Sequence, residues 1–316
     1  MTLQRAVAFA PASIGNVAVG FDLLGLAIDH VGDTVVAERS NEPGIHLAEI
    51  VGDDIAADAN QLSLDPKKNT ATLAAEALWR DAGETDGLTL KLRKGTPLGS
   101  GMGSSAASAV ASVVAANALL TEPRSLDSLI DFAVAGEAFA SGALHADNVA
   151  PSLLGGLVFC PSRLLPHTMQ IPVPDDIVSV LVHPHLRVNT VDARRALRED
   201  VPLQTVVEQS GRLAGFVHAC HTNARDLIAS CLADVMIEPQ RARFVDGFQT
   251  VKDAALEKGA LGCSLSGSGP SVFALAGVES AEPIRNAMIA AFRAIDVASD
   301  AWISPMNCPG ARVLET

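Results

Sequence analysis

The N-terminal part of the chain carries short apolar runs separated by residues that favour turns. Glycine, proline and aspartate divide these runs, a pattern typical of β-strands joined by tight connections. We expect strands at residues 6–10, 27–30, 34–39, 45–50 and 88–92. Before the last of these, residues 70–81 repeat apolar positions at helical spacing, which predicts a helix.

The rest of the chain mixes helical and strand patterns. Residues 106–120 are small and apolar and predict a helix, and residues 126–141 predict a second helix that Gly142 ends. Later elements interleave, with strands expected at 155–159, 178–183 and 271–276, and helices at 205–233, 241–258 and 283–295. Since they form no repeated βαβ series, the pattern indicates an α+β fold. The proline-dotted connection 161–174 predicts a boundary between domains 1–165 and 166–316.

Composition narrows the class of protein. The chain of 316 residues is 48% hydrophobic and 19% charged, which suits a soluble protein of about two domains. Its net charge of −13 disfavours nucleic acid and anionic membranes as partners, so an anionic substrate needs a local basic cluster. We find neither a signal peptide nor a long enough apolar span, and the five scattered cysteines are typical of reduced thiols. We therefore expect a cytoplasmic protein.

The most informative segment is the glycine- and serine-rich run 97–107, which leads directly into the predicted helix. Its glycines allow a tight turn and a close approach of the backbone to a ligand. The amides of the first helical turn, together with the helix dipole, favour a phosphate group. No lysine follows the last glycine, so the run is not a Walker A loop, and its spacing is not that of a dinucleotide fingerprint. The alternative is a glycine-rich helix start that only permits close packing.

Two further segments carry candidate binding residues. Residues 10–29 place Asn16 and Asp22 in a small, apolar stretch, where Asp22 could pair with an ammonium group. Both residues also suit an ordinary turn. Residues 262–275 form a second glycine- and serine-rich turn whose amides could surround an anion, the alternative being a plain β-hairpin loop.

In this order along the chain, the three segments resemble the three motifs of the GHMP kinases, a superfamily that includes galactokinases, homoserine kinases and mevalonate kinases. The chain looks most like the homoserine kinases, on residues 11–25, 145–156 and 310–314 and over essentially its whole length. The resemblance implies a two-domain GHMP kinase fold. Its N-terminal domain would be like domain 2 of ribosomal protein S5, and its C-terminal domain would have ferredoxin-like α/β layers.

The resemblance also implies ATP and Mg²⁺ as cofactors. The residues implied to surround the triphosphate are Pro97, Leu98, Gly99, Ser100, Gly101, Met102, Gly103, Ser104, Ser105, Ala106 and Ala107. Ser105 and Glu137 are the implied ligands of Mg²⁺, and both are expected to be catalytic. A carboxylate within the apolar run 130–140 needs a partner if it is buried, although an exposed helix face is the alternative. Asp147 occupies the place of the superfamily's candidate base.

The implied substrate is L-homoserine, phosphorylated on its side-chain hydroxyl in threonine biosynthesis. The residues implied to bind it are Asn16, Asp22, Asn148, Arg194 and Arg241. Asp22 suits the ammonium group, and the planar guanidinium of arginine suits the carboxylate. Arg195 and Arg243 lie close by in the sequence, so either arginine assignment could shift, and surface salt bridges are the alternative for all four.

Two other functions stay open at this point. One is a GHMP kinase acting on a polyol or isoprenoid alcohol, and the other is a sensor that keeps the fold without catalysis. The acid and the arginines favour a zwitterionic substrate, and the intact glycine loop with Glu137 favours an enzyme. A homodimer is compatible with the sequence.

Overall fold

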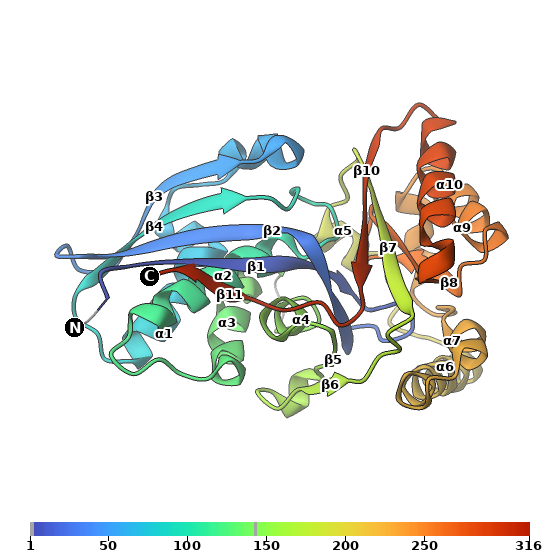
Figure 1. Ribbon diagram of the computed structural model, residues 1–316, viewed down its shortest axis with the longest axis horizontal. Helices are drawn as coiled ribbons and strands as arrows, with labels where there is room; N and C mark the ends of the chain where they lie inside the picture. Colours follow the sequence, from blue (N-terminus) through green and yellow to red (C-terminus); the bar gives the residue numbers. More distant parts are fainter. Residues whose placement is uncertain (1–2, 142–143) are drawn as a thin grey trace.

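The structure is a computed structural model that describes residues 3–141 and 144–316, and within these ranges the strands form two β-sheets (Figure 1). The first sheet has the order β11-β1-β2-β4-β3, with β5 and β6 added beside β2. Its strands are β1 (Arg5–Gly15), β2 (Leu24–Ser40), β3 (Ile45–Gly52), β4 (Gly87–Lys94), β5 (Leu157–Phe159), β6 (Met169–Ile171) and β11 (Arg312–Glu315). The second sheet has the order β10-β7-β9-β8 and is antiparallel. Its strands are β7 (Ile177–Pro184), β8 (Gly262–Leu265), β9 (Val272–Gly277) and β10 (Ser299–Pro305).

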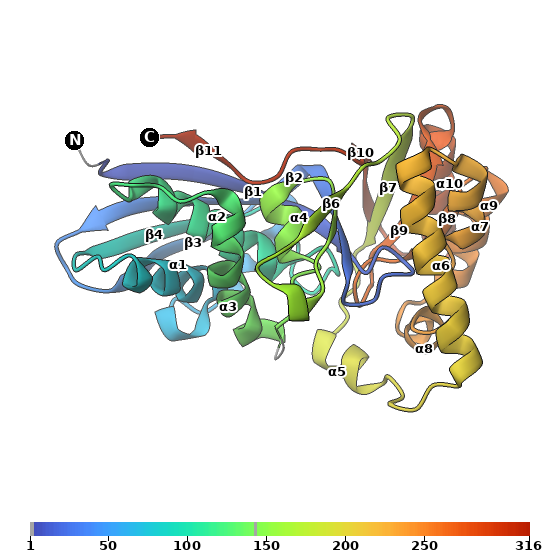
Figure 2. The ribbon, with the colours of Figure 1, turned by 90° about the horizontal axis from the view of Figure 1, so that it is seen from below.

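Four α-helices cover the first sheet on one side (Figure 2). They are α1 (Thr70–Asp81), α2 (Ser104–Leu119), α3 (Ile130–Ser141) and α4 (Val149–Leu154). Helix α2 packs on β1 and β2 and is itself flanked by α1 and α3. It is therefore buried on nearly all sides, which explains why its sequence consists mainly of alanine, valine and serine.

The remaining α-helices follow β7. They are α5 (Thr190–Arg195), α6 (Leu203–Thr222), α7 (Arg225–Cys231), α8 (Glu238–Arg241), α9 (Phe248–Glu257) and α10 (Ala281–Arg293). Short 3₁₀ turns lie at Asp54–Gln61, Pro66–Lys68, Leu126–Leu129, Ser162–Leu164, Ala242–Phe244 and Val278–Ser280. Helices α9 and α10 share a core with the second sheet. A separate apolar cluster, which includes Ile14, Leu24, Phe216 and Phe273, joins the ends of β1 and β2 to the second sheet. The two halves of the chain are thus packed together through apolar side chains.

The expected α+β class is confirmed, and the helix at 70–81 is found at those bounds. The predicted helix at 205–233 was wrong in its continuity, because Asn223 adopts a left-handed conformation (φ 52°) between α6 and α7. The predicted helix at 241–258 is likewise divided, and α9 begins after Gly247, whose φ is 79°. Gly142, the expected end of the second helix, lies outside the described residues.

Other differences concern the strands. The strands expected at 27–30 and 34–39 are one long strand, β2, whose pairing with β1 shifts register near Pro11, and His30 has a φ of 67°. Strands β6, β10 and β11 were not predicted. Because β6 and β11 pair within the first sheet, both ends of the segment 166–316 contact it, and the domain boundary after residue 165 stays a prediction.

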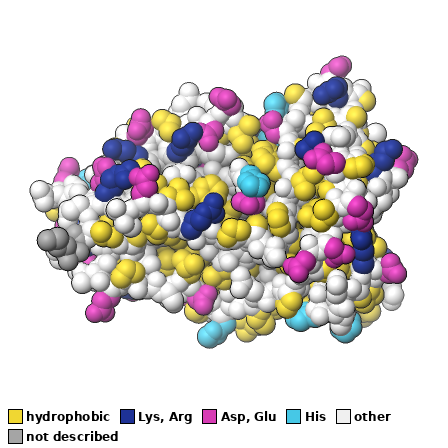
Figure 3. Space-filling view, in the orientation of Figure 1, with side chains coloured by type: hydrophobic (Ala, Val, Ile, Leu, Met, Phe, Trp, Pro, Cys, Tyr) yellow, Lys and Arg dark blue, Asp and Glu magenta, His cyan; other side chains and the backbone are white. Residues whose placement is uncertain are grey.

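Two global features complete the description. None of the helices in residues 3–141 and 144–316 has the length and apolar character that a membrane span requires. The five cysteines are buried free thiols. On the face shown in Figure 3, Lys and Arg side chains lie beside Asp and Glu side chains, in keeping with ion pairs such as Arg5–Glu38 and Arg5–Glu315.

Candidate functional site

The three segments singled out in the sequence meet where the two sheets adjoin. The amide of Ser13, near the end of β1, donates to the carbonyl of Met102 at 3.0 Å. The amide of Gly267 donates to the carbonyl of Gly15 at 3.1 Å. Backbone hydrogen bonds therefore join the first segment both to the loop before α2 and to the turn between β8 and β9.

The loop before α2, residues 95–103, also contacts that turn directly. Ser271 donates its amide to the carbonyl of Ser100 at 3.1 Å, and the Ser266 hydroxyl donates to the carbonyl of Gly101 at 2.7 Å. Gly101 has a φ of 76°, and a Cβ there would lie 2.5 Å from the Ser266 carbonyl oxygen and 2.6 Å from that of Gly269. A residue with a side chain therefore cannot replace Gly101 without moving one of the two segments.

A cavity of about 270 Å³ lies beside this loop at the N-terminus of α2. Leu98, Gly99 and Gly103 line it, as do Ser105 and Glu137, and its lining also includes Leu62, Asn69, Thr70 and Phe139. Gly103 caps α2 in a left-handed conformation, with a φ of 66°. The N-terminus of a helix favours anions, because its first amides have no partner within the helix. This end of the cavity is therefore suited to a phosphate group.

Ser105 and Glu137, the two Mg²⁺ ligands that the resemblance implies, are hydrogen-bonded to each other. The Ser105 hydroxyl on α2 donates to Glu137 Oε1 on α3 at 2.9 Å. Burial raises the pKa of Glu137 to about 7, the hydrogen bond from Ser105 opposes that shift, and the nearby Asp147 adds to it. Within the described residues there is no group of three or more His, Cys, Asp and Glu side chains suited to a metal. One carboxylate and one hydroxyl fit Mg²⁺, which proteins usually hold through one or two carboxylates together with substrate phosphates.

Asp22 and Arg194 form an ion pair across the junction of the two halves. Arg194, on α5, donates to both oxygens of Asp22 at 3.1 and 2.6 Å. Its Nη2 also lies 2.9 Å from Nε2 of His145. Burial lowers the pKa of His145, and the Asp22 carboxylate opposes that effect. The Arg194 and Asp22 side chains are 37% and 21% exposed, so a small molecule can reach both groups.

Arg241 approaches the same place from α8. It is buried, and its Nη1 donates to the carbonyl of Gly267 at 3.1 Å. The Phe21 ring contacts both guanidinium groups. Its centroid lies 5.4 Å from Cζ of Arg194 and 5.2 Å from Cζ of Arg241. Burial lowers the pKa of Arg241, and the Asp22 carboxylate opposes that shift. The two arginines therefore converge on one aromatic side chain beside Asp22.

Asn16, Asn148 and Asp147 lie between the cavity at α2 and the Asp22–Arg194 pair. Asn16 accepts a hydrogen bond from the amide of Asp22 at 3.0 Å and donates to the carbonyl of Gly267 at 3.1 Å. Asn148 lines the cavity and accepts a hydrogen bond from the Ser13 hydroxyl at 2.9 Å. Burial, together with the nearby Asp22 carboxylate, raises the pKa of Asp147 to about 7. The Asp147 carboxylate therefore interacts electrostatically with the carboxylates of both Asp22 and Glu137.

Several predicted residues occupy positions that limit their roles. The Met102 side chain is fully buried in the apolar cluster between the halves, so it does not line the cavity. Ala106 and Ala107 are fully buried in α2, and the Ser104 hydroxyl donates to the carbonyl of Thr96 at 3.0 Å. Pro97 lines a neighbouring hollow and not the cavity at α2. Of these residues, only Ser104 lines the cavity at the N-terminus of α2.

The structure also separates the alternative arginines. Arg243 lies over the Phe244 ring at 5.0 Å, whereas Arg241 lies over Phe21. Arg194 binds Asp22, while its neighbour Arg195 stands at the last position of the short helix α5. The geometry therefore favours Arg194 and Arg241 over their neighbours.

Sequence reasoning missed four residues near the site: Phe21, Asp33, Lys94 and His145. One signal was available for Lys94, because it is the last residue of the strand that leads into the glycine loop. Asp33 gave no such signal, because its strand, β2, also contains the acidic residues Asp29 and Glu38. Nothing in the sequence showed that these two residues, far apart along the chain, form a pair.

Comparison with known proteins places this geometry in a family. Residues 69–156 match the GHMP kinases N terminal domain, and residues 213–294 match the GHMP kinases C terminal domain. A homoserine kinase of Xylella fastidiosa (strain M12) is 46% identical, over 99% of this chain and 95% of its own length. A homoserine kinase of Chlorobium phaeobacteroides (strain BS1) is 42% identical, over 99% of this chain and 100% of its own.

A solved structure agrees with these relatives. The crystal structure of homoserine kinase from Cytophaga hutchinsonii superposes with a TM-score of 0.94 at 40% identity, covering 99% of this chain and 98% of that one. The expected two-domain GHMP kinase fold is thereby confirmed. The chain belongs to the GHMP kinases and, within them, to the homoserine kinase family.

Proposed function

We propose that this protein transfers the γ-phosphoryl group of Mg·ATP to the side-chain hydroxyl of L-homoserine, producing O-phospho-L-homoserine and ADP. The observation that carries the proposal is the partly exposed Asp22–Arg194 pair beside the cavity at the N-terminus of α2. An amino acid carries an ammonium and a carboxylate group, and this pair offers the opposite charge to each. Neither a sugar nor an isoprenoid alcohol presents both charges.

The loop residues 97–107 are assigned to the triphosphate. The glycines allow the backbone to follow the phosphate oxygens closely, and the dipole of α2 favours their negative charge. Ser105 and Glu137 are assigned to hold Mg²⁺, which when bound neutralises charge on the transferred phosphoryl group. Because this reaction depends mainly on positioning and electrostatics, holding both substrates in one cleft supplies much of the rate enhancement.

The amino-acid side is assigned to five residues. Asp22 binds the ammonium group, Arg194 and Arg241 bind the carboxylate, and Asn16 and Asn148 offer amide groups to the remainder of the substrate. We assign Asp147 as acceptor of the hydroxyl proton, because burial raises its pKa to about 7, near the pH at which a general base is most effective.

The experiment is a comparison of acceptors with the purified protein. ADP release is measured with Mg·ATP and L-homoserine, mevalonate or galactose in turn, with a reaction lacking any acceptor as the control. We expect rapid release only with homoserine, and mass spectrometry should place the phosphate on its side-chain hydroxyl. A folded protein that phosphorylates mevalonate or galactose and leaves homoserine untouched contradicts the proposal.

A further inference from the structure

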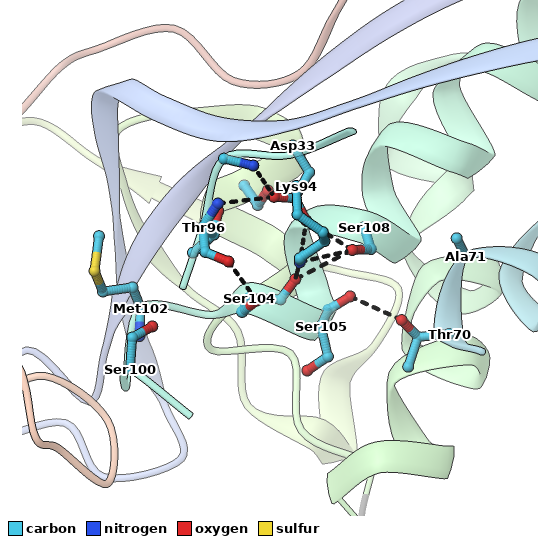
Figure 4. Close-up of polar contacts among 12 residues, drawn as sticks. Asp33, Thr70, Ala71, Lys94, Thr96, Ser100, Met102, Ser104, Ser105 and Ser108 are labelled. Carbon is cyan, nitrogen blue, oxygen red and sulfur yellow. Dashed lines mark hydrogen bonds and ion pairs between the residues drawn. The ribbon is translucent and has the colours of Figure 1, made fainter. Parts of the chain in front are cut away.

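A fully buried ion pair contacts both ends of the loop before α2 (Figure 4). Lys94 is the last residue of β4, and Asp33 belongs to β2; their side chains are 1% and 0% exposed. Removing two charges from water costs several kcal/mol for each ion, so such a pair persists only when its hydrogen bonds are well satisfied.

Lys94 connects this pair to the start of α2. Its Nζ contacts Asp33 Oδ2, donates to the carbonyl of Ser104 at 2.7 Å and donates to the Ser108 hydroxyl at 2.9 Å. A lysine ammonium has three N–H donors, and these three acceptors occupy all of them. Lys94 therefore has no donor left for a phosphate group, although it lines the cavity.

Asp33 connects the pair to the other end of the loop. Its Oδ1 accepts hydrogen bonds from the amides of Gly95 and Thr96, each at 3.1 Å. Its Oδ2 accepts from the Ser108 hydroxyl at 2.6 Å in addition to Lys94. A single carboxylate thus holds the residues that open the loop and, through Lys94 and Ser108, the helix that closes it.

We propose that Lys94 and Asp33 are positioning residues for the triphosphate: they fix the two ends of the phosphate loop relative to each other without touching the nucleotide. This inference rests on the proposed function, because it takes the loop as the triphosphate site. A loop whose amides must all face one anion is sensitive to the separation of its ends. Loss of the pair should therefore weaken the binding of phosphate groups and leave the binding of the nucleoside unchanged.

The test measures two dissociation constants for each variant, one for Mg·ATP and one for adenosine, by calorimetry without homoserine. In Asp33→Leu/Lys94→Met, both charges are replaced by apolar side chains, so that no unpaired charge is buried. We expect the affinity for Mg·ATP to fall about 10- to 100-fold, since charge-assisted hydrogen bonds no longer hold the loop. The affinity for adenosine should stay within about twofold, because the nucleoside does not require those loop amides.

A matched control and a milder variant accompany the test. Lys252→Met/Glu238→Gln removes a partly buried lysine–carboxylate pair in the other half of the molecule, with side chains 16% and 10% exposed. This control should leave the ratio of the two dissociation constants unchanged. If the double variant does not fold, Ser108→Ala removes only the bridging hydroxyl and should lower the affinity for Mg·ATP by a few fold, again without affecting adenosine.

The outcomes are distinct. If the affinities for Mg·ATP and adenosine fall together, or if neither falls while the melting temperature drops, the pair serves only the stability of the fold and the inference is overturned. A wild-type protein that binds Mg·ATP but does not phosphorylate homoserine contradicts the proposed function alone. In that case the ratio of the two constants still decides the role of Lys94 and Asp33.

Discussion

Two ion pairs of the site, Lys94–Asp33 and Arg194–Asp22, each join a basic side chain to an aspartate but differ in burial. The Lys94–Asp33 pair is sealed from solvent, and every polar atom of it has a partner in the protein. The Arg194–Asp22 pair is 37% and 21% exposed and joins residues on opposite sides of the junction between the halves. The first pair cannot exchange partners without unfolding its surroundings, whereas the second can.

This difference shows how burial decides the use of a charge. An exposed pair contributes little to stability, so its partners can be separated at small cost. The proposed substrate carries one charge of each sign, so Asp22 and Arg194 can each exchange the hydrogen bonds between them for hydrogen bonds to the substrate. A sealed pair offers no such exchange and is suited to holding backbone in place.

The stability of the protein should respond very differently to the loss of each cation. Lys94→Met leaves the Asp33 carboxylate buried without its cation and should lower the free energy of unfolding by about 3–5 kcal/mol. Arg194→Met should change it by less than about 1 kcal/mol, because its side chain is partly exposed. Urea unfolding at pH 7 measures both. Similar losses in the two variants would remove the basis of the comparison.

Loss of either proposed Mg²⁺ ligand, Ser105 or Glu137, should affect the rate more than the stability of the fold. Ser105→Ala and Glu137→Gln should each lower kcat roughly 10²- to 10³-fold, since electrostatic stabilisation of the transition state is lost. Ser112→Ala is the matched control, because Ser112 lies on the same helix and its hydroxyl donates to the Ala71 carbonyl. Steady-state kinetics with thermal unfolding distinguishes the roles. Large losses of stability with wild-type turnover in the folded fraction would indicate a structural role.

Loss of either arginine that is assigned to the substrate carboxylate should weaken the binding of homoserine. Arg194→Leu and Arg241→Leu should each raise the KM for homoserine about 10- to 100-fold, the effect of losing one charge-assisted hydrogen bond. The KM for ATP should change little, and Arg195→Leu and Arg243→Leu serve as matched controls.

An ester of homoserine sharpens this test, because it lacks the carboxylate charge. The wild type should reject the ester strongly and the two leucine variants much less. If those variants reject the ester as strongly as the wild type does, the carboxylate is bound elsewhere, and Arg195 and Arg243 become the next candidates.

The smallest expected effect concerns His183, a buried histidine that contacts the same loop through Ser271. His183 Nδ1 lies 3.1 Å from the Ser271 hydroxyl, and the amide of Ser271 donates to Ser100 in the loop. Burial lowers the pKa of His183 from 6.5 to about 4; the neighbouring His185 adds to this shift, and Asp300 opposes it. The unfolded chain therefore binds the proton more readily, and stability is lost as pH falls from about 6.5 towards 4.

Between pH 7 and pH 5 this histidine should cost about 2 kcal/mol of stability. His183→Gln has no such proton, so its stability should fall by that much less over the same interval. Urea unfolding of both proteins at the two pH values provides the measurement. Parallel losses would show that His183 does not carry this pH dependence.

The sequence predicted the local features of the site well. Glycine spacing and an apolar helix are properties of neighbouring residues, so the loop at 97–107 and the helix after it were recognisable. The partnership of Lys94 with Asp33 was not, because it depends on the pairing of β2 with β4. The choice between Arg194 and Arg195 likewise depends on how the short helix α5 packs.

The fold shows the same difference between features set by neighbouring residues and features set by distant ones. The helix at 70–81 follows from its own periodicity. Strand β11 has four exposed side chains and no inward-facing apolar pattern, so only its pairing with β1 defines it. The break at Asn223 depends on a left-handed residue within an otherwise helical pattern, which periodicity alone does not register.

The return of β11 to the first sheet has a consequence for folding during synthesis. The chain leaves this sheet after β6, forms the whole second sheet, and only then supplies the strand that pairs with the outer edge of β1 (Figure 1). Domains generally fold in the order in which the ribosome releases them. Here the hydrogen-bonding edge of β1 stays open until residues 177–305 have been made, and an open edge invites pairing with other chains. The ribosome-bound chain therefore exposes a strand edge that the finished protein covers with its own last strand.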